Sequence, residues 1–557
     1  MTEFGPFTPI EAAIARHAAA AVGRTPDEIA LAPPKHPGQG DLASPVAMSL
    51  ARSARRAPRE IAEQIAADLR GDAGSGAWLT SVEVAGPGFL NLELSQRWFS
   101  ETAADMRNAG RERGAGAAAR HEAILLEYVS ANPTGPPHVG HARNAAYGDS
   151  LARILAFAGH RVSREYYVND HGRQIRTFGA SVAARYAQIA GHDVPVPEDG
   201  YRGEYVGDLA ARLREEVGDV YVDEIVRDGP AAPGPLAFFS GRGGGLMLDE
   251  VIAELAVFRT TFDDFFREST LHHEGRVAAA IRTLEGAGDA YHHDGAVWFR
   301  TSAYGDEKDR VLVRSNGEET YLASDVAYHL DKARRGHDRL IDVLGADHHG
   351  YIARLRAVLA AEGEDPDLLE VAIVQLVSLL ERGEAAKMSK RAGTIVTLGE
   401  LVADVGVDVA RFFLVQRSHE TAMELDLDLA RAQSQENPVY YVQYAHARCC
   451  SILAEVGGAG EAHSLPPEEI GPDERRLTLR LAEWPGVVRE ASARRAPHGV
   501  AAHLIDLARD FHGFYHRCRV KGEAPEVLAF RRDLVLATRD TVATGLDLLG
   551  VAAPERM

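Results

Sequence analysis

The chain has 557 residues, of which 45% are hydrophobic and 25% are charged. This length and composition predict a globular protein of about three domains. The formal net charge of −20 argues against nonspecific binding to nucleic acid. No apolar run approaches the roughly 18–20 residues of a membrane span, and the first residues lack the basic start and apolar core of a signal peptide.

The cysteines indicate in which cellular compartment the protein lies, and they argue against a zinc site built from cysteines. Cys449, Cys450 and Cys518 form no C-x-x-C pair. The sequence therefore predicts neither a disulfide framework nor a zinc site built from cysteines. We expect a cytoplasmic protein with no membrane contact, no zinc and no metal held by protein side chains.

Three regions follow one another along the chain. We predict a first domain over 1–115, which ends in the Gly-rich stretch 108–120. Over 120–430 short apolar runs alternate with helical patterns, and an insertion is expected at about 165–310. This alternation predicts a parallel sheet with helices on its faces. Over 431–557 the patterns are helical, which predicts a bundle.

Strand–helix pairs can be placed within the middle region. Residues 123–130 predict a buried strand, and 141–159 predict the helix that follows it. Residues 339–347 and 351–363 form a second such pair. Residues 370–380 fit either a strand or a buried helix, so both assignments stay open.

Two later features concern loops and helices. Residues 227–246 have the Pro and Gly density of a long surface loop and look like an insertion. Residues 439–456 and 500–518 carry apolar stripes at helical spacing. Phe511 and Phe514 lie on the second stripe, so we expect both mostly in the core.

A basic segment lies inside the acidic chain. From Arg475 to Arg532 there are twelve Lys or Arg and six Asp or Glu. Such a segment fits a nucleic-acid footprint, and it equally fits an Arg-rich helical surface without a binding role. Charge alone leaves both interpretations open.

The stretch ANPTGPPHVGH, 131–141, separates a predicted strand from a predicted helix. Ligands of doubly wound sheets bind at the carboxyl ends of strands, where helix N-termini offer free N–H groups to phosphate. Gly140 lets a ligand approach the backbone closely. His138 and His141 share a helix face, from which imidazoles can stabilise charge on a transferring group.

A zinc site and a helix cap are competing interpretations of this histidine pair. The pair fits half of a zinc site, but no further ligand pattern supports one. It also fits a simple helix cap, which the residues alone leave equally open. Neither a G-x-G-x-x-G nor a P-loop pattern is present in the chain.

A second motif is AAKMSKRAGTI, 385–395. Lys387 and Lys390, on a loop bracketed by Gly383 and Gly393, suit a triphosphate whose charge rises as pyrophosphate leaves. Taken alone, the pair is better interpreted as an exposed charged turn.

Together, H-V-G-H at 138–141 and K-M-S-K at 387–390 resemble the two signatures of class I aminoacyl-tRNA synthetases. Longer segments of the chain are similar in sequence to segments of arginyl-tRNA synthetases. These segments are SANPTGPPHVGHAR, YYVNDHGRQI, YRGEYVG, YLASDVAYHLDK, GADHHGYIARL, KMSKRAGTIVTLGEL and ARDFHGFYHRCRV. GDLASPVAMSLAR and VAGPGFLNLEL resemble that family's N-terminal appended domain. The resemblance covers nearly the whole chain.

This resemblance implies a fold and an activity. The fold would be multidomain α/β, with a Rossmann-like class I catalytic domain carrying insertions, an N-terminal α+β domain that contacts tRNA, and a C-terminal all-α bundle that binds the anticodon. The activity would be that of an arginine–tRNA ligase. It would form arginyl-adenylate from L-arginine and ATP with Mg²⁺, then arginyl-tRNA(Arg), AMP and pyrophosphate. We expect a monomer.

The resemblance also assigns residues to the small substrates. His138, His141, Lys387 and Lys390 would be catalytic. ATP would contact Asn132, Pro133, Thr134, Gly135, His138, Gly140, His141, Gly345, Asp347, Lys387, Met388, Ser389 and Lys390. Arginine would contact Glu127, Asn132, Tyr321, Asp325 and His348.

Chemistry supports a carboxylate in the arginine site. A guanidinium pairs with a carboxylate through two parallel hydrogen bonds. Asp325 lies four residues after Tyr321, so the two face one way at a helix start. Asp325 also fits a helix N-cap. Asp347 and His348 alternatively fit bonds to their own loop backbone.

Candidates for tRNA contact lie in the C-terminal region. Aromatic side chains stack on splayed bases, and cations meet phosphates. The candidates are Tyr440, Tyr444, Arg509, Tyr515, Arg517, Arg519 and Lys521.

Some residues differ from those usual in the family, and some alternative functions are also compatible with parts of the sequence. Pro137 and Asn144 replace commoner residues, but neither removes a group that the chemistry needs. The alternatives are a class I synthetase for another amino acid, a paralogue that binds without charging, and a nucleotidylyltransferase without tRNA. The missing zinc cysteines argue against a synthetase for cysteine or methionine. The intact histidines and lysines argue against a paralogue that does not charge tRNA, and the basic helical region argues against a nucleotidylyltransferase.

Overall fold

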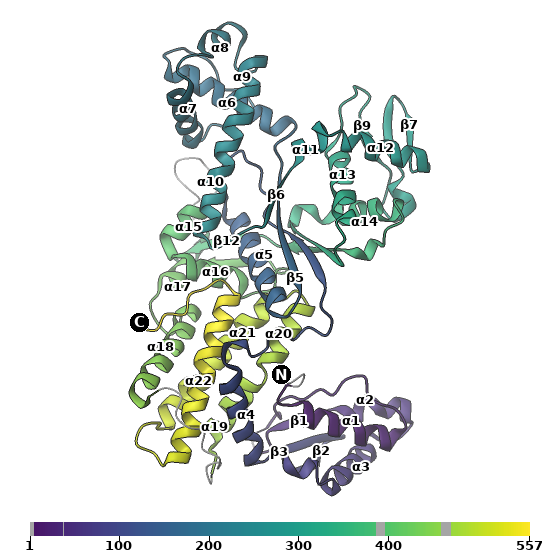
Figure 1. The fold of residues 1–557 in the computed structure, drawn as a ribbon, viewed down its shortest axis with the longest axis vertical. Coiled ribbons are helices and arrows are strands. Elements are labelled where there is room, and N and C mark those ends of the chain that lie inside the picture. The colour runs from purple at the N-terminus through teal and green to yellow at the C-terminus, as the bar shows by residue number, and fades with distance from the viewer. Residues whose placement is uncertain (1–4, 37, 386–395, 458–468) are drawn as a thin grey trace.

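The computed structural model describes residues 5–36, 38–385, 396–457 and 469–557 (Figure 1). Lys387, Met388, Ser389 and Lys390 therefore lie outside the described residues. In the part of the chain that is described, no helix is both long and apolar enough to cross a membrane.

The N-terminal domain is a small α+β unit. Its antiparallel sheet has the order β1-β3-β2, and α1 and α3 pack against each other beside it. The elements are α1 (Thr8–Val22), β1 (Leu42–Ser44), α2 (Val46–Ala54), α3 (Pro58–Gly71), β2 (Leu79–Ala85), β3 (Phe89–Leu94) and α4 (Gln96–Ala109).

A five-stranded parallel sheet forms the centre of the molecule. Its order is β11-β10-β4-β5-β6, so β4 lies in the middle. Its strands are β4 (Ala123–Glu127), β5 (Arg161–Val168), β6 (Asp264–Arg267), β10 (Arg339–Gly345) and β11 (Leu369–Val374). Helix α5 (Val139–Phe157) connects β4 to β5, and α14 (Ile352–Ala361) connects β10 to β11. The predicted strand–helix pairs are therefore present, and 370–380 is strand, not helix.

Two modules are inserted between strands of this sheet. A helical module between β5 and β6 lies at the top of Figure 1, and a second module with a three-stranded antiparallel sheet lies beside it. The first has α6 (Arg173–Ile189), α7 (Glu204–Val217), α8 (Val222–Asp228), α9 (Pro233–Phe238) and α10 (Gly244–Val257). The second has α11 (Glu268–His273), α12 (Arg276–Ala287), β7 (Ala290–His293), β8 (Ala296–Phe299), β9 (Arg310–Val313) and α13 (Tyr321–Arg334).

The prediction of a long surface loop at 227–246 was wrong. The segment instead holds α9, a wide helical turn over Phe239–Gly243 and the start of α10. Pro233 occupies the first turn of α9, where proline costs no helical hydrogen bond. A Cβ on Gly244 would lie 2.8 Å from Ile175, so this glycine permits close helix packing. The glycines serve packing here, which composition alone does not reveal.

A small sheet and a helical bundle complete the chain. The sheet has β12 (Val377–Glu381), β13 (Glu384–Ala385) and β14 (Met423–Asp426), and α15 (Leu398–Val405), α16 (Val407–Val415) and α17 (Leu427–Arg431) accompany it. The bundle has α18 (Pro438–Val456), α19 (Pro472–Ala482), α20 (Trp484–Ala493), α21 (Pro497–Arg517) and α22 (Pro525–Leu548). Phe511 and Phe514 are fully buried in it, as predicted.

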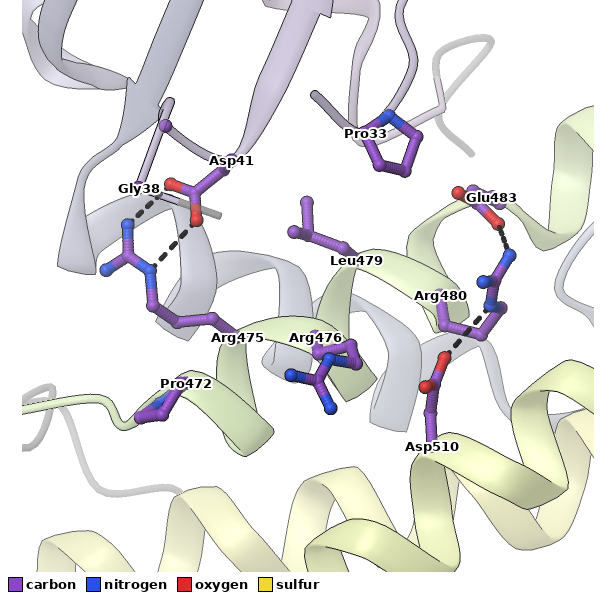
Figure 2. Close-up of a pocket in the computed structure, with 11 residues that line it drawn as sticks. Pro33, Gly38, Asp41, Pro472, Arg475, Arg476, Leu479, Arg480, Glu483 and Asp510 are labelled. Carbon is purple, nitrogen blue, oxygen red and sulfur yellow. Dashed lines mark hydrogen bonds and ion pairs between the residues drawn. The ribbon is translucent and has the colours of Figure 1, made fainter. Parts of the chain in front are cut away.

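The N-terminal domain is held against the bundle by partly buried polar contacts. Figure 2 shows Asp41 of the N-terminal domain paired with Arg475 of α19, with 3.0 Å between Oδ1 and Nε. The Arg475 guanidinium also lies 4.5 Å from the centre of the Phe99 ring. Nearby, Arg107 of α4 donates to Asp533 of α22 over 2.6 Å. A cavity of about 290 Å³ lies beside the first pair.

Candidate active site

The carboxyl end of β4 leads into a strained loop. Val129 and Ser130 have φ angles of 68° and 42°, a region that residues other than glycine seldom adopt. The Asn144 side chain supports this turn, because its Oδ1 accepts from Val129 N–H at 2.7 Å and its Nδ2 donates to the Val343 carbonyl at 3.0 Å. Asn144 therefore fixes the β4 loop to β10.

His138 and His141 cap the N-terminus of α5. His138 is the N-cap residue, and its Nδ1 accepts from Gly140 N–H at 3.1 Å. The Nδ1 of His141 accepts from His138 N–H at 3.3 Å. The two rings stack with centroids 3.8 Å apart. A Cβ on Gly140 would lie 2.9 Å from the His138 ring, so Gly140 makes room for this cap.

These contacts set the protonation of both imidazoles. Burial lowers the pKa of His138, and burial together with the neighbouring His138 lowers the pKa of His141 to about 4. Both rings are therefore neutral near pH 7. Because each Nδ1 accepts a hydrogen bond, each ring carries its proton on Nε2. The cap and the phosphate-donor interpretations are thus compatible, since capping orients an Nε2–H donor.

The described neighbours of the lysine motif lie at the histidine cap. His138 forms a β-bridge with Thr397, Val139 N–H donates to the Val396 carbonyl at 3.0 Å, and Leu398 N–H donates to the Pro137 carbonyl at 2.7 Å. Thr397 begins α15. The chain that leaves the lysine motif is therefore hydrogen-bonded to the segment that carries the first histidine.

The loop before the cap is held mainly by buried contacts. Pro133 and Thr134 are buried, and the Thr134 carbonyl accepts from the Tyr205 hydroxyl at 2.8 Å. A Cβ on Gly135 would lie 3.0 Å from the same hydroxyl. Asn132 is partly exposed and donates to Gln174 of α6. This part of the predicted ATP contact surface is thus built jointly by the loop and the helical insertion.

Tyr321 and Asp325 lie one turn apart at the start of α13. Thr320 is the N-cap of this helix, so the N-cap interpretation of Asp325 was wrong. Among the described residues the Asp325 carboxylate has no ion-pair partner. Burial, reinforced by the nearby Glu268 and Glu127 against the opposing effect of His329, raises the pKa of Asp325 to about 7. Tyr321 is 49% exposed beside it. The start of α13 thus holds a carboxyl that a cation would stabilise.

Three buried carboxylates lie in one row across the sheet. Asp342 of β10 is in register with Glu127 of β4, and Glu127 is in register with Glu165 of β5. All three side chains are buried. Lys332 of α13 donates to Asp342 over 2.7 Å and also to Glu127. Glu127 is therefore already ion-paired at its inner oxygen.

The turn after β10 carries the other predicted contacts. Gly345 ends β10, and Asp347 and His348 follow within a short 3-10 helix over Ala346–Tyr351. The His348 ring lies 5.5 Å from the Tyr351 ring. This turn lies at the same carboxyl edge as the β4 loop, since both strands are parallel neighbours.

In the bundle, four side chains form an aromatic–arginine ladder, which we define as Tyr440, Tyr444, Arg448 and Tyr515. The Tyr440 and Tyr444 rings stack with centroids 6.3 Å apart. The Arg448 guanidinium lies 5.0 Å from the centre of the Tyr444 ring and 4.7 Å from that of Tyr515. A cavity of about 400 Å³ adjoins Arg448 and Tyr515 and is also lined by Arg517, Arg519 and Lys521.

Several predicted tRNA-binding cations are already paired with acids. Arg509 pairs with Asp506, Arg517 pairs with Asp473, and Lys521 lies 3.4 Å from Glu455. These three cations are exposed, so each ion pair is worth little in stability and exchanges readily for a phosphate. The segment 475–532 therefore offers fewer unpaired positive charges at the surface than its count of Lys and Arg suggests.

Sequence reasoning missed Glu268, Lys332 and Arg143 around the candidate active site, and Arg448 in the ladder of the bundle. Lys332 lies seven residues after Asp325, and this spacing puts it on the same helix face. Arg143 is 1% exposed and donates to the carbonyls of Gln375, Ser418 and Thr421 at 2.8–2.9 Å. Nothing in the sequence indicates those partners. Within the described ranges, no group of His, Cys, Asp and Glu side chains is arranged to hold a metal ion.

Three family descriptions match consecutive parts of the chain. "Arginyl tRNA synthetase N terminal domain" matches 8–94, "tRNA synthetases class I (R), catalytic domain" matches 107–197 and 248–439, and "DALR anticodon binding domain" matches 442–557. The catalytic description leaves 198–247 unmatched, which is most of the helical insertion between β5 and β6.

Curated relatives and solved structures agree with these matches. The arginine–tRNA ligase of Shouchella clausii is 45% identical over 537 residues, which cover 95% of this chain and 94% of the relative. That of Bacillus subtilis is 43% identical and covers 98% of both chains. The arginyl-tRNA synthetase structure of Thermus thermophilus is 25% identical, has a TM-score of 0.77 and covers 98% of this chain and 99% of that one. The chain therefore belongs to the arginyl-tRNA synthetase family, and its function is that of a class I arginine–tRNA ligase.

Proposed function

We propose that the chain forms arginyl-adenylate at the carboxyl edge of its parallel sheet and passes the arginyl group to the 3′ end of tRNA(Arg). A carboxylate oxygen of arginine attacks the α-phosphorus of ATP, and pyrophosphate leaves. A terminal ribose hydroxyl of tRNA then attacks the arginyl carbonyl, and AMP leaves. No covalent enzyme intermediate is needed, so positioning and charge stabilisation carry the rate.

The Asp325 carboxyl is the observation that carries the arginine assignment. Its raised pKa reflects an uncompensated charge in a buried acidic setting, and a guanidinium that pairs with it relieves that cost. Tyr321 lies one turn away and is exposed. Glu127 and Asn132, at the end of β4 and in its loop, would meet the amino and carbonyl ends of the substrate, and His348 would lie near it.

The histidine cap supports an ATP site. Neutral imidazoles with Nε2–H donors can hydrogen-bond phosphate oxygens without repelling Mg²⁺ that accompanies ATP. The N-terminus of α5 adds a favourable partial positive charge. The remaining contacts would come from the 132–135 loop and from Gly140, Gly345 and Asp347. Lys387, Met388, Ser389 and Lys390 would stabilise the departing pyrophosphate; their described neighbours at 396–398 support this placement.

The ladder in the bundle supports anticodon contact. Its stacked tyrosines present flat faces to unpaired bases, and the adjacent cations suit phosphates. Tyr440, Tyr444 and Tyr515 would stack, whereas Arg509, Arg517, Arg519 and Lys521 would contact the backbone. A role in translation supports a cytoplasmic location.

Pyrophosphate exchange tests the substrate assignment. The full chain is assayed with ATP, Mg²⁺ and each amino acid in turn, with and without tRNA. Exchange is expected with arginine alone among the amino acids. Exchange with another amino acid, and none with arginine, would overturn the assignment. Asp325→Asn should abolish most arginine use while ATP affinity persists, and the exposed Asp193→Asn serves as the matched control.

A further inference from the structure

The carboxylate row beneath the substrate pocket needs cations to exist. Asp342, Glu127 and Glu165 occupy neighbouring positions of three parallel strands. Like charges placed directly opposite one another repel, and burial disfavours each charge further. Such a row is stable only if cations lie within contact distance of each oxygen pair.

Helix α13 supplies the compensating groups from one face. His329 Nε2 lies 2.9 Å from Asp342, and Lys332 Nζ contacts both Asp342 and Glu127. Arg335, just after the helix, contacts Glu165. The row therefore has one cation for each carboxylate, and Lys332 is the cation that joins two of them.

Lys332 is held in this role by its surroundings. Its side chain is fully buried, and its ammonium lies 4.4 Å from the centre of the Tyr328 ring. The Tyr328 hydroxyl lies 2.6 Å from Glu165 and 3.0 Å from Glu127. Burial alone would favour neutral lysine, but Asp342 and Glu127 outweigh it and raise the pKa of Lys332. The ammonium is thus a permanent part of the site.

Glu127 links this buried network to the pocket. Its Oε2 receives Lys332 and Tyr328, whereas its Oε1 accepts from the Ser130 hydroxyl at 2.8 Å. Ser130 belongs to the strained loop that leads to the histidine cap. The orientation of Glu127 on the substrate side therefore depends on the cation behind it.

We propose that Lys332 is a positioning residue for arginine: it holds the Glu127 carboxylate in its orientation while Asp342 and Glu165 flank it, so that Glu127 can receive the substrate's ammonium. The inference rests on the proposed role of Glu127 in substrate binding. Lys332 itself touches no substrate. Its removal leaves buried carboxylates short of one cation, so the row takes up a proton near neutral pH and Glu127 loses its set orientation.

The test compares the KM for arginine and for ATP in pyrophosphate exchange measured with tRNA present. Lys332→Met should raise the arginine KM roughly 10- to 100-fold at pH 6.5 with the ATP KM within about twofold. The ratio of variant to wild-type arginine KM should shrink toward pH 9, because the extra proton dissociates. A loss caused only by misfolding would affect both substrates at every pH. The exposed Lys308→Met is the matched control.

A second variant restores the balance of charge. Lys332→Met with Asp342→Asn removes one cation and one carboxylate, so the double variant should recover about tenfold in arginine KM relative to the single one. An arginine KM within twofold of wild type in Lys332→Met, or a double variant as impaired as the single, would overturn the proposal. If Lys332→Met does not fold, the proposal would instead be overturned by a double variant whose arginine KM is more than about tenfold above that of the wild type. Failure of wild-type exchange with arginine would concern the proposed function alone.

Discussion

Lowering the pH from 8 to 6 is expected to weaken arginine binding by about tenfold, because Asp325 must be ionised to pair with a guanidinium. With a pKa of about 7, the Asp325 carboxyl is ionised in about ten of eleven molecules at pH 8 and in about one of eleven at pH 6. The apparent dissociation constant rises in that proportion. His141 does not contribute, since burial and the neighbouring His138 lower its pKa to about 4.

The other groups around Asp325 require a control. Glu268 lies close enough to raise the pKa of Asp325, and burial raises the pKa of Glu268 as well; Glu127, Asp342 and His329 also lie within electrostatic reach of Asp325. Asp325→Asn keeps the shape and removes the titrating charge. The variant should bind arginine roughly 30- to 5000-fold more weakly, which corresponds to 2–5 kcal/mol for one member of a buried charge pair. Its remaining affinity should vary less than twofold between pH 6 and 8.

Isothermal titration of the full chain with arginine, in the presence of tRNA, measures both effects. Arginine stays a cation at each pH, so the free ligand does not change. A pH dependence that survives unchanged in Asp325→Asn would refute the reasoning, because another group would then be the one that titrates. A wild-type affinity that is constant from pH 6 to 8 would refute it equally.

Three further outcomes follow from the same contacts. Without arginine, Asp325→Asn should raise the free energy of unfolding by roughly 1–3 kcal/mol above pH 7. Calorimetry should find that this gain is lost as the pH falls toward 4, because the raised pKa of Asp325 penalises only the ionised carboxyl. His138→Ala should slow adenylate formation by roughly 10²–10³-fold and destabilise the fold by about 1 kcal/mol through the lost cap; a rate within threefold would contradict the donor role. Tyr444→Ala should weaken tRNA binding by about 1–3 kcal/mol while tRNA-independent ATP affinity is unchanged, and filter binding that finds equal tRNA affinity would argue against the ladder as a stacking surface.

The parallel sheet and the bundle could be predicted because their periodic patterns are local. The strand at 123–130 and the helix after it needed only an apolar run and a helical stripe. The end of this strand could not be placed from the sequence, because the turn at Val129 depends on Asn144. Asn144 belongs to the following helix, and its side chain accepts a hydrogen bond from the loop. The loop predicted at 227–246 failed for a related reason: only tertiary packing against α6 distinguishes a glycine that packs from one that bends.

The sequence indicated where candidate residues lie when they belong to short motifs, and it did not indicate contacts between residues that are distant in the chain; the roles of the candidate residues stay predictions. The histidine pair and Asp325 belong to the first group. The carboxylate row belongs to the second, since Asp342, Glu127 and Glu165 become neighbours only through strand order and register. Lys332 was within reach of a pattern argument, because it shares a helix face with Asp325, but its acceptors were not.

The contact between Asp41 and Arg475 joins residues that are 434 positions apart in the chain. Both side chains are largely enclosed, so either one left alone would be a buried charge without a partner. The two positions therefore restrict each other during sequence divergence: a neutral residue at one is tolerated when the other changes with it. An exchange of the N-terminal domain between relatives would meet the same restriction, and it should succeed only when the donor domain brings an acid that matches the arginine of α19.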